Sequence, residues 1–171
     1  AGFGSKRTSN VRIDLNQTAV HDFVLDPAIS EEVTVVADAP RINVSDGEIK
    51  QTMRTEEIMT LPQPNQTNFL NLASTFGGFN DNPSSGQNNP TLSSGSSVNF
   101  NGAGTRGTTF QINGVNNDDS SENQNRQGVA LSTIQEFQVL KNGYSAEFGR
   151  GDGAVVLVQT KSGTNRVSGD V

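Results

Sequence analysis

The apolar run at residues 154–163 is the strongest hydrophobic signal in the chain, and it follows a segment, 149–153, with three glycines in five positions. The run is rich in valine, which predicts a strand. Glycine lets two backbones approach closely and adopts positive φ without strain, so Gly149, Gly151 and Gly153 predict a tight hinge. We therefore expect the chain to be organised around residues 144–163, a hinge followed by its best strand.

Alternation of apolar and polar residues marks the other predicted strands. The alternating segments are residues 11–15, 21–25, 98–102, 108–115 and 136–141. A period of two places successive side chains on opposite faces, so each segment predicts a strand with one buried face. The turn-forming run Asn16-Gln17-Thr18 joins the first two segments, which predicts an adjacent antiparallel pair.

Helical spacing is confined to short stretches. Thr55 is expected to cap a helix over residues 56–59, whose two glutamates suit the positive end of the helix dipole. No clear strand pattern is present in residues 46–54, and a helical turn is expected near residues 131–134. A second helix with a core-facing stripe is predicted from apolar residues at helical intervals, namely Phe69, Leu72, Ala73 and Phe76.

Two long polar segments interrupt these elements. Residues 80–97 and 116–127 consist largely of Asn, Ser, Gly, Gln and Asp. Such side chains bury too little apolar surface to offset the entropy of ordering, so both segments predict loops. The resulting fold class is α+β, with a small mixed β-sheet, short helices and long polar loops.

An acidic step leads into a short β-prone run at residues 31–40, which Pro40 ends. Valine and threonine favour the extended backbone. The segment is therefore expected to be either an edge strand or an extended peptide with which another protein pairs by strand addition.

Composition and charge argue against several classes of function. Only 32% of the 171 residues are hydrophobic, so the core is small and much of the surface is polar. The net charge of −6 and the absence of a Lys/Arg cluster argue against nucleic-acid binding. The chain has no cysteine, which excludes disulfides and thiolate chemistry, and it has no apolar run long enough for a membrane-spanning helix.

Several motif matches have plainer explanations. Residues 102–107 spell G-x-G-x-x-G, but a strand and not a helix is predicted after them, so we expect a strand turn and no nucleotide cofactor. Residues 150–152 spell Arg-Gly-Asp within the glycine hinge. The acidic residues of 116–122 miss the spacing of a calcium loop, so no metal site is expected. His21 is the only histidine, and no nucleophile motif accompanies it, so we expect no catalytic residues and no enzyme.

An ordered set of motifs resembles the plug domain of TonB-dependent outer-membrane receptors, in particular the Oar-like subgroup. Phe110-Gln111-Ile112-Asn113-Gly114-Val115 is similar to a D-G-V segment of the family, with Asn113 in place of the usual Asp. Thr67 likewise stands where an arginine is common. The other matching segments, in chain order, are Leu61-Pro62, residues 68–72, residues 100–106, residues 134–141, residues 144–149 and residues 160–165.

This resemblance implies a domain plan and a location. Residues 1–30 are expected to be the last strands of a carboxypeptidase-regulatory-like β-sandwich, 31–40 a TonB-box-like segment, 41–163 the plug, and 164–171 the start of the receptor's barrel. The plug would lie inside that barrel in the bacterial outer membrane, with the TonB box facing the periplasm. Its partners would be the C-terminal domain of TonB, the barrel, and a transported substrate that the sequence does not identify.

The resemblance also implies roles for particular residues. The TonB-binding residues would be Glu32, Val33, Thr34, Val35, Val36 and Ala37, mobile until TonB binds. The contacts to the barrel would be Arg106, Arg150 and Glu147, and the hinge would be Gly149, Gly151 and Gly153. The substrate-facing loops would present Asn82, Gln87, Asn88, Asn117, Asp118 and Asp119.

A second function class uses the same features. A free-standing secreted adhesion or carbohydrate-binding module would also present polar loops on a β-rich scaffold. The two hypotheses differ in whether a barrel follows the plug, so the downstream reading frame distinguishes them.

Overall fold

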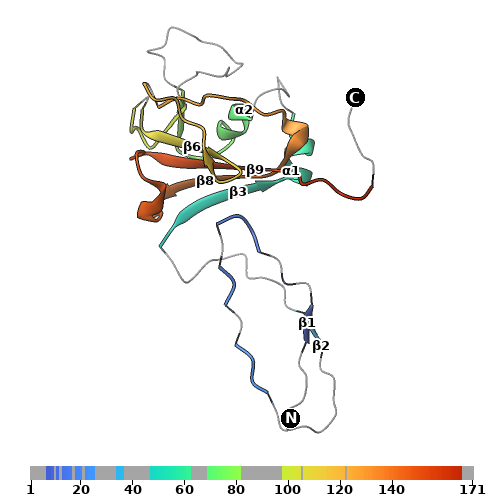
Figure 1. Cartoon of the computed structure of the whole chain (residues 1–171). Helices are drawn as coiled ribbons and strands as arrows, with labels where there is room; N and C mark the ends of the chain where they lie inside the picture. The colour runs from blue at the N-terminus through green and yellow to red at the C-terminus, as the bar shows by residue number, and fades with distance from the viewer. Residues whose placement is uncertain are drawn as a thin grey trace. The chain divides into compact units, whose positions relative to one another are not determined.

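The computed structural model describes residues 7–9, 11, 13–16, 18–20, 22–25, 34–36, 47–62, 69–81, 98–104, 106–121 and 123–166. The chain divides into two compact units, Ala1–Ser45 and Asp46–Val171 (Figure 1). Each unit is considered by itself below.

The first unit contains a small parallel sheet. Strand β1, Arg7–Ser9, pairs with strand β2, Thr34–Val36, in a register that sets Thr8 opposite Val35. Residues 34–36 therefore have the extended conformation that their β-branched side chains favour. Of the two structures expected for residues 31–40, an edge strand or an extended peptide free to pair, these three residues form the edge strand.

The predicted antiparallel pair at residues 11–15 and 21–25 is wrong for the residues that the structure describes there. None of them belongs to a strand, although Asn16 does turn the chain with φ of 52°. Alternation produces a strand only when a neighbouring strand and an apolar surface are available. Here Ile13 and Val24 remain 60% and 71% exposed, so their side chains have no such surface to cover.

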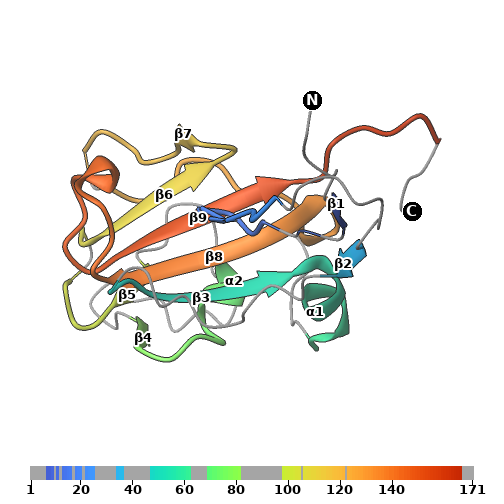
Figure 2. The same cartoon turned by 90° about the horizontal axis from the view of Figure 1, so that it is seen from below.

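The second unit is built on one mixed five-stranded sheet, and Figure 2 shows its four longer strands side by side. The strand order is β3-β8-β9-β6-β7, with β6 and β9 parallel and the other neighbours antiparallel. The bounds are Ile49–Arg54 for β3, Thr108–Ile112 for β6, Val115–Asn116 for β7, Ile134–Asn142 for β8 and Ala154–Thr160 for β9. The α+β prediction with a small mixed sheet is confirmed.

Strand β9 is the central strand of this sheet. It pairs with β8 on one side and β6 on the other, and residues 154–158 are all buried. A strand buried in this way has few polar side chains, which explains why it is the strongest hydrophobic signal in the sequence. The strand predicted at residues 154–163 is confirmed, and it ends at Thr160.

Short helices and a second small sheet complete the unit. Helix α1 is Thr55–Thr60 and helix α2 is Leu70–Ala73, while the 3-10 turns η2 and η3 are Leu131–Thr133 and Ala146–Phe148. Strands β4, Phe79–Asp81, and β5, Val98–Phe100, pair antiparallel across the polar segment between them. The predicted helices and helical turn are confirmed, although α2 is shorter than its apolar stripe.

Local details differ from three sequence predictions. Arg54, and not Thr55, precedes helix α1, and its amide donates to Glu57 Oε2 (3.1 Å). The weak stretch before it forms strand β3, because an edge strand needs little apolar patterning. The predicted strand 108–115 is a hairpin, since Asn113 and Gly114 have φ of 52° and 77° and turn the chain.

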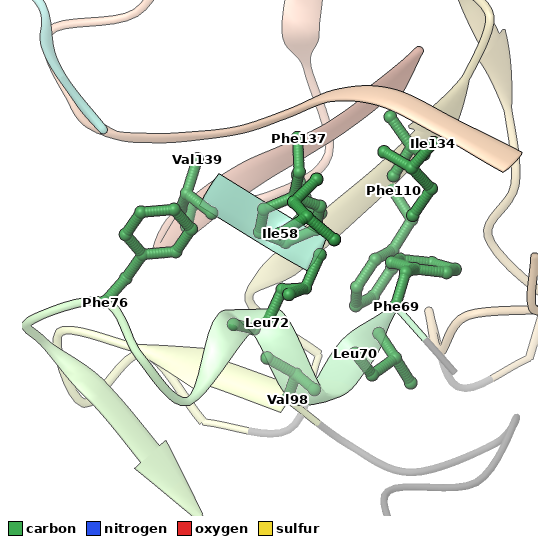
Figure 3. Packing of buried hydrophobic residues seen from close by; sticks show 14 of the residues in the cluster. Ile58, Phe69, Leu70, Leu72, Phe76, Val98, Phe110, Ile134, Phe137 and Val139 are labelled. Atoms are coloured by element: carbon green, nitrogen blue, oxygen red, sulfur yellow. The ribbon is translucent and has the colours of Figure 1, made fainter. Parts of the chain in front are cut away.

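The hydrophobic core lies between α2 and one face of the sheet. Figure 3 shows side chains from α1, α2, β5, β6 and β8 converging there. Phe137 is fully buried, stacks on Phe76 with ring centroids 5.6 Å apart and lies 6.2 Å from the ring of Phe69. The predicted stripe Phe69, Leu72, Ala73 and Phe76 is buried, as expected.

We expect Phe137→Ala to lower the free energy of unfolding by about 3–5 kcal/mol, because it leaves a cavity between two aromatic rings and the sheet. Val115→Ala is the matched control, since Val115 is 68% exposed and should change stability by less than about 0.5 kcal/mol. Urea unfolding followed by circular dichroism measures both. Equal losses in the two variants would contradict this account of the core.

Candidate functional site

The hinge before β9 is a place where two backbones nearly touch. The amide of Gly153 donates to the carbonyl of Gly107 (2.9 Å), and the amide of Ala154 reaches the same oxygen (3.3 Å). A Cβ on Gly153 would lie 2.9 Å from the carbonyl oxygen of Phe100, and one on Gly151 would lie 2.8 Å from that of Gly107. The predicted close approach is therefore confirmed at Gly151 and Gly153.

The prediction that the hinge glycines adopt positive φ is wrong, and no close approach occurs at Gly149. Gly149 has nothing closer than 3.8 Å to a Cβ, and positive φ occurs at Arg150 (76°) instead of at any hinge glycine. A non-glycine residue in that region is strained unless its neighbours hold it. Two hydrogen bonds do so, from Thr109 Oγ1 to the Gly149 carbonyl (3.3 Å) and from the Tyr144 hydroxyl to the Gly151 carbonyl (2.9 Å).

The three side chains proposed to contact a barrel are all on the surface. Arg150 projects from the strained turn, Glu147 lies on η3, and Arg106 precedes β6. The carbonyl of Arg106 accepts a hydrogen bond from Asn123 Nδ2 (2.9 Å), which fixes the backbone there. Arg150 lies in the hinge itself, and Arg106 precedes Gly107, whose carbonyl accepts from the Gly153 amide, so the two arginines and the hinge glycines lie at one end of the sheet.

The polar segment 116–127 is a folded cap and not a free loop. Asn117 Nδ2 donates to Asn125 Oδ1 and to the Gln127 carbonyl (2.8 Å), while the Arg126 amide donates to the Asn117 carbonyl (2.8 Å). Asn117 and Asp118 are 7% and 3% exposed. This corrects the expectation that both present their side chains to substrate, because local hydrogen bonds and burial hold them inside the segment.

Side chains of this cap take the place of a strand along β6. Asp118 Oδ1 accepts from the amide of Phe110 (2.6 Å), and Asn123 Nδ2 donates to the carbonyl of Thr108 (3.1 Å). Strand β7 pairs only with residues 111 and 112, so it leaves these two backbone groups without a strand partner. The cap therefore closes the outer edge of β6, a role that composition alone does not reveal.

Asp118 is a buried carboxyl whose pKa is shifted. Burial raises its pKa above the usual value, and the hydrogen bonds from the Phe110 amide and the Asn116 side chain oppose that rise. The charges of Arg150 and Arg126 also favour its ionised form. Arg126 was not singled out from the sequence, because nothing in its neighbourhood predicts that its charge acts on Asp118.

Other predicted positions are only partly within the described chain. Asp119 is half-buried and accepts a hydrogen bond from the Ser121 amide (2.7 Å). The described residues contain no group of acidic or histidine side chains able to hold a metal ion, and no helix among them is long and apolar enough to cross a membrane. Positions outside the described residues are His21, Glu32, Val33, Ala37, Asn82, Gln87 and Asn88.

We expect Gly153→Ala to destabilise the fold by about 1–3 kcal/mol, because its Cβ overlaps backbone that cannot move without disturbing β5 and β6. Gly149→Ala is the matched control, with space for a methyl group and φ that is not positive. Thermal unfolding of the two variants gives the difference. A Gly153→Ala variant as stable as Gly149→Ala would rule out the close approach.

Comparison with known proteins agrees with this geometry. The family described as TonB-dependent Receptor Plug Domain matches residues 50–156. The TonB-dependent transporter Oar of Myxococcus xanthus is 24% identical over 164 residues, which cover 95% of this chain and 15% of that relative. The chain thus spans about a seventh of the length of that curated relative.

Solved structures share the fold. The outer membrane transporter YddB of Escherichia coli aligns with a TM-score of 0.54 at 16% identity, covering 66% of this chain and 17% of that one. The siderophore receptor PirA of Acinetobacter baumannii aligns with a TM-score of 0.51 at 21% identity, covering 68% and 18%.

These findings favour the plug over a free-standing adhesion or carbohydrate-binding module. Members of the matched family are outer-membrane proteins, whose plugs are transport components that partner with their own barrel and with TonB. The match covers more than half of the sequence and includes the hinge and the central strand. The chain therefore belongs to the TonB-dependent receptor plug domain family.

Proposed function

We propose that this chain is the gate of an outer-membrane transporter, in which force applied by TonB to residues 31–40 loosens the plug and lets substrate pass. Family membership supports the gate, and the edge position of β3 supports the route of the force. Residues 31–40 would face the periplasm and the sheet would occlude the lumen. No reaction is catalysed in this proposal.

TonB capture would use strand addition at residues 32–37. Thr34–Val36 are extended and pair with β1 through one edge, and an extended segment offers its other backbone groups to a new strand. The main-chain hydrogen bonds would provide affinity, and the alternating side chains would provide register.

Force entering there would reach β3 first along the chain. β3 has a single strand neighbour, β8, and its side chains are less buried than those of β8 and β9. The side-chain hydrogen bonds that fasten it to β8 include one from Gln138 Nε2 to Thr52 Oγ1 (2.8 Å) and one from Lys141 Nζ to Gln51 Oε1 (2.9 Å). Hydrogen bonds at a partly solvated edge open one after another, so β3 is the strand that would detach first.

The charged residues around the hinge would hold the plug in its barrel. Arg106, Arg150 and Glu147 are exposed on the described chain, and Arg150 lies in a hinge that is tightly packed at Gly151 and Gly153. Guanidinium groups bind carboxylates through paired hydrogen bonds, which position a domain yet break under load. The outward part of the cap, from Asp119 to Ser121, together with Asn82, Gln87 and Asn88, would meet the substrate.

We expect Val35→Pro to weaken capture by the purified TonB C-terminal domain roughly tenfold, because proline removes an amide donor and bars regular pairing. Val35→Thr is the matched control, since it keeps the amide and the β-branched shape. A pull-down followed by titration of TonB measures both. Unchanged capture by Val35→Pro would exclude strand addition at this segment.

We also expect a Thr52→Cys, Gln138→Cys disulfide to block the first extension event when the receptor is pulled by its N-terminal segment in a supported bilayer. These residues face each other across β3 and β8 and are hydrogen-bonded, so their spacing suits a disulfide. The chain has no native cysteine to compete. Reduction should restore the event, and each single cysteine variant should behave like the parent. An event that persists in the oxidised variant would refute β3 as the first strand to detach.

A further inference from the structure

Asparagine followed by glycine is the dipeptide most prone to spontaneous deamidation, because glycine has no side chain to hinder attack by its backbone nitrogen. The chain contains three such pairs, which begin at Asn101, Asn113 and Asn142. All three asparagines are exposed. Exposure therefore does not predict which asparagine deamidates fastest. The hydrogen bonds of the three side chains do, because they restrain the reacting amide.

The first two asparagine amides are held by the fold. Asn113 Oδ1 accepts from the Thr160 amide (2.9 Å), and Asn113 Nδ2 donates to Thr160 Oγ1 (3.0 Å). Asn101 Nδ2 lies 3.3 Å from each of two acceptors, the carbonyls of Lys141 and Gly153. Both side chains must break these contacts before the carbonyl carbon can turn toward the next residue, which lowers the reactive population.

Asn142 lacks such restraint. Within the described part of the chain its side chain has no hydrogen-bond partner. It is the last residue of β8 and pairs with Ile49, where the register of the β3–β8 ladder shifts. A strand end beside a register irregularity opens more readily than the middle of the ladder.

The glycine of this pair is required by the fold. Gly143 has φ of 69°, and a Cβ on it would lie 2.6 Å from the carbonyl oxygen of Gly47. A larger residue would both strain the backbone and overlap it. The turn after β8 therefore imposes glycine after an unrestrained asparagine.

We propose that Asn142 is the site at which this protein deamidates, with water as the co-reactant. The Gly143 nitrogen bonds to Asn142 Cγ, the Cγ–Nδ2 bond breaks, and ammonia leaves with the proton from the amide, which forms a cyclic imide. Water then adds to either imide carbonyl and breaks one carbon–nitrogen bond. The product is Asp or isoaspartate at position 142, with a new negative charge opposite Ile49 at the start of β3.

Tryptic peptides separate the three sites. Cleavage at Arg54, Arg106, Arg126, Lys141 and Arg150 places Asn101 in peptide 55–106, Asn113 in peptide 107–126 and Asn142 in peptide 142–150. The folded protein, in its membrane preparation, is incubated in mildly alkaline buffer, and each peptide is followed for a mass increase of about one dalton. Fragment ions assign the modified asparagine.

We expect Asn142 to react roughly tenfold faster than Asn101 or Asn113 in the folded protein, and all three to react at similar rates in concentrated urea. Thr160→Val removes one partner of Asn113 with little change of shape, so it should accelerate reaction at Asn113 and leave Asn142 unchanged. Asn142→Gln should abolish the change in peptide 142–150. The proposal is overturned if Asn101 or Asn113 reacts as fast as Asn142 in the folded protein, or if Asn142 reacts only in urea.

Discussion

The close approach of two backbones at Gly107, Gly151 and Gly153 is the constraint on which the second unit depends. It sets the start of β6 beside the start of β9, so that the two strands run parallel although the chain between them is long. Parallel strands need such a crossover, and here it contains β8, which returns to cover the other side of β9. One tight contact therefore decides which strand is central.

The placement of β9 then divides the sheet into a firm part and a looser one. β9 and the strands next to it carry the side chains that meet α2 in the core, and burial of Phe137 on β8 and of Val156 and Val158 on β9 stabilises that part. At one outer edge β3 is held by β8 and a few polar contacts, whereas at the other a folded cap covers β6. The proposed gate needs this difference, because a domain that opens under load must have a weaker edge and a part that stays folded.

The sequence alone predicts the elements whose signal is local. Val155–Val158 form an apolar run, and Phe69, Leu72 and Phe76 recur at helical spacing, so both elements are evident from pattern. β3 is not, because its residues Lys50, Gln51 and Thr52 are polar and its pairing with β8 depends on residues some 90 positions away along the chain. The described residues of the alternating segments 11–15 and 21–25 show the converse, since a strand pattern without a partner forms no strand.

At the candidate functional site, too, features with a local sequence signal could be predicted, and features that depend on distant hydrogen bonds could not. Gly151 and Gly153 are predictable because glycine has few other uses before a strand, but the strained φ of Arg150 depends on hydrogen bonds from Thr109 and Tyr144. Asn117 and Asp118 look like loop residues in sequence and are buried in the structure, because polar side chains can satisfy one another within a short segment. Composition describes such a segment and does not reveal its hydrogen bonds.

The cap on β6 has a consequence for the partly open state that the proposed gate requires. An uncovered strand edge is a template on which other chains can add, and repeated addition leads to β-aggregation. Asp118 and Asn123 occupy the backbone groups of Phe110 and Thr108 with side chains, which cannot extend a ladder to another molecule. In the proposed gate, a plug that loosens from the β3 side would keep these two backbone groups of β6 occupied, so this part of the sheet would not add a strand from another molecule.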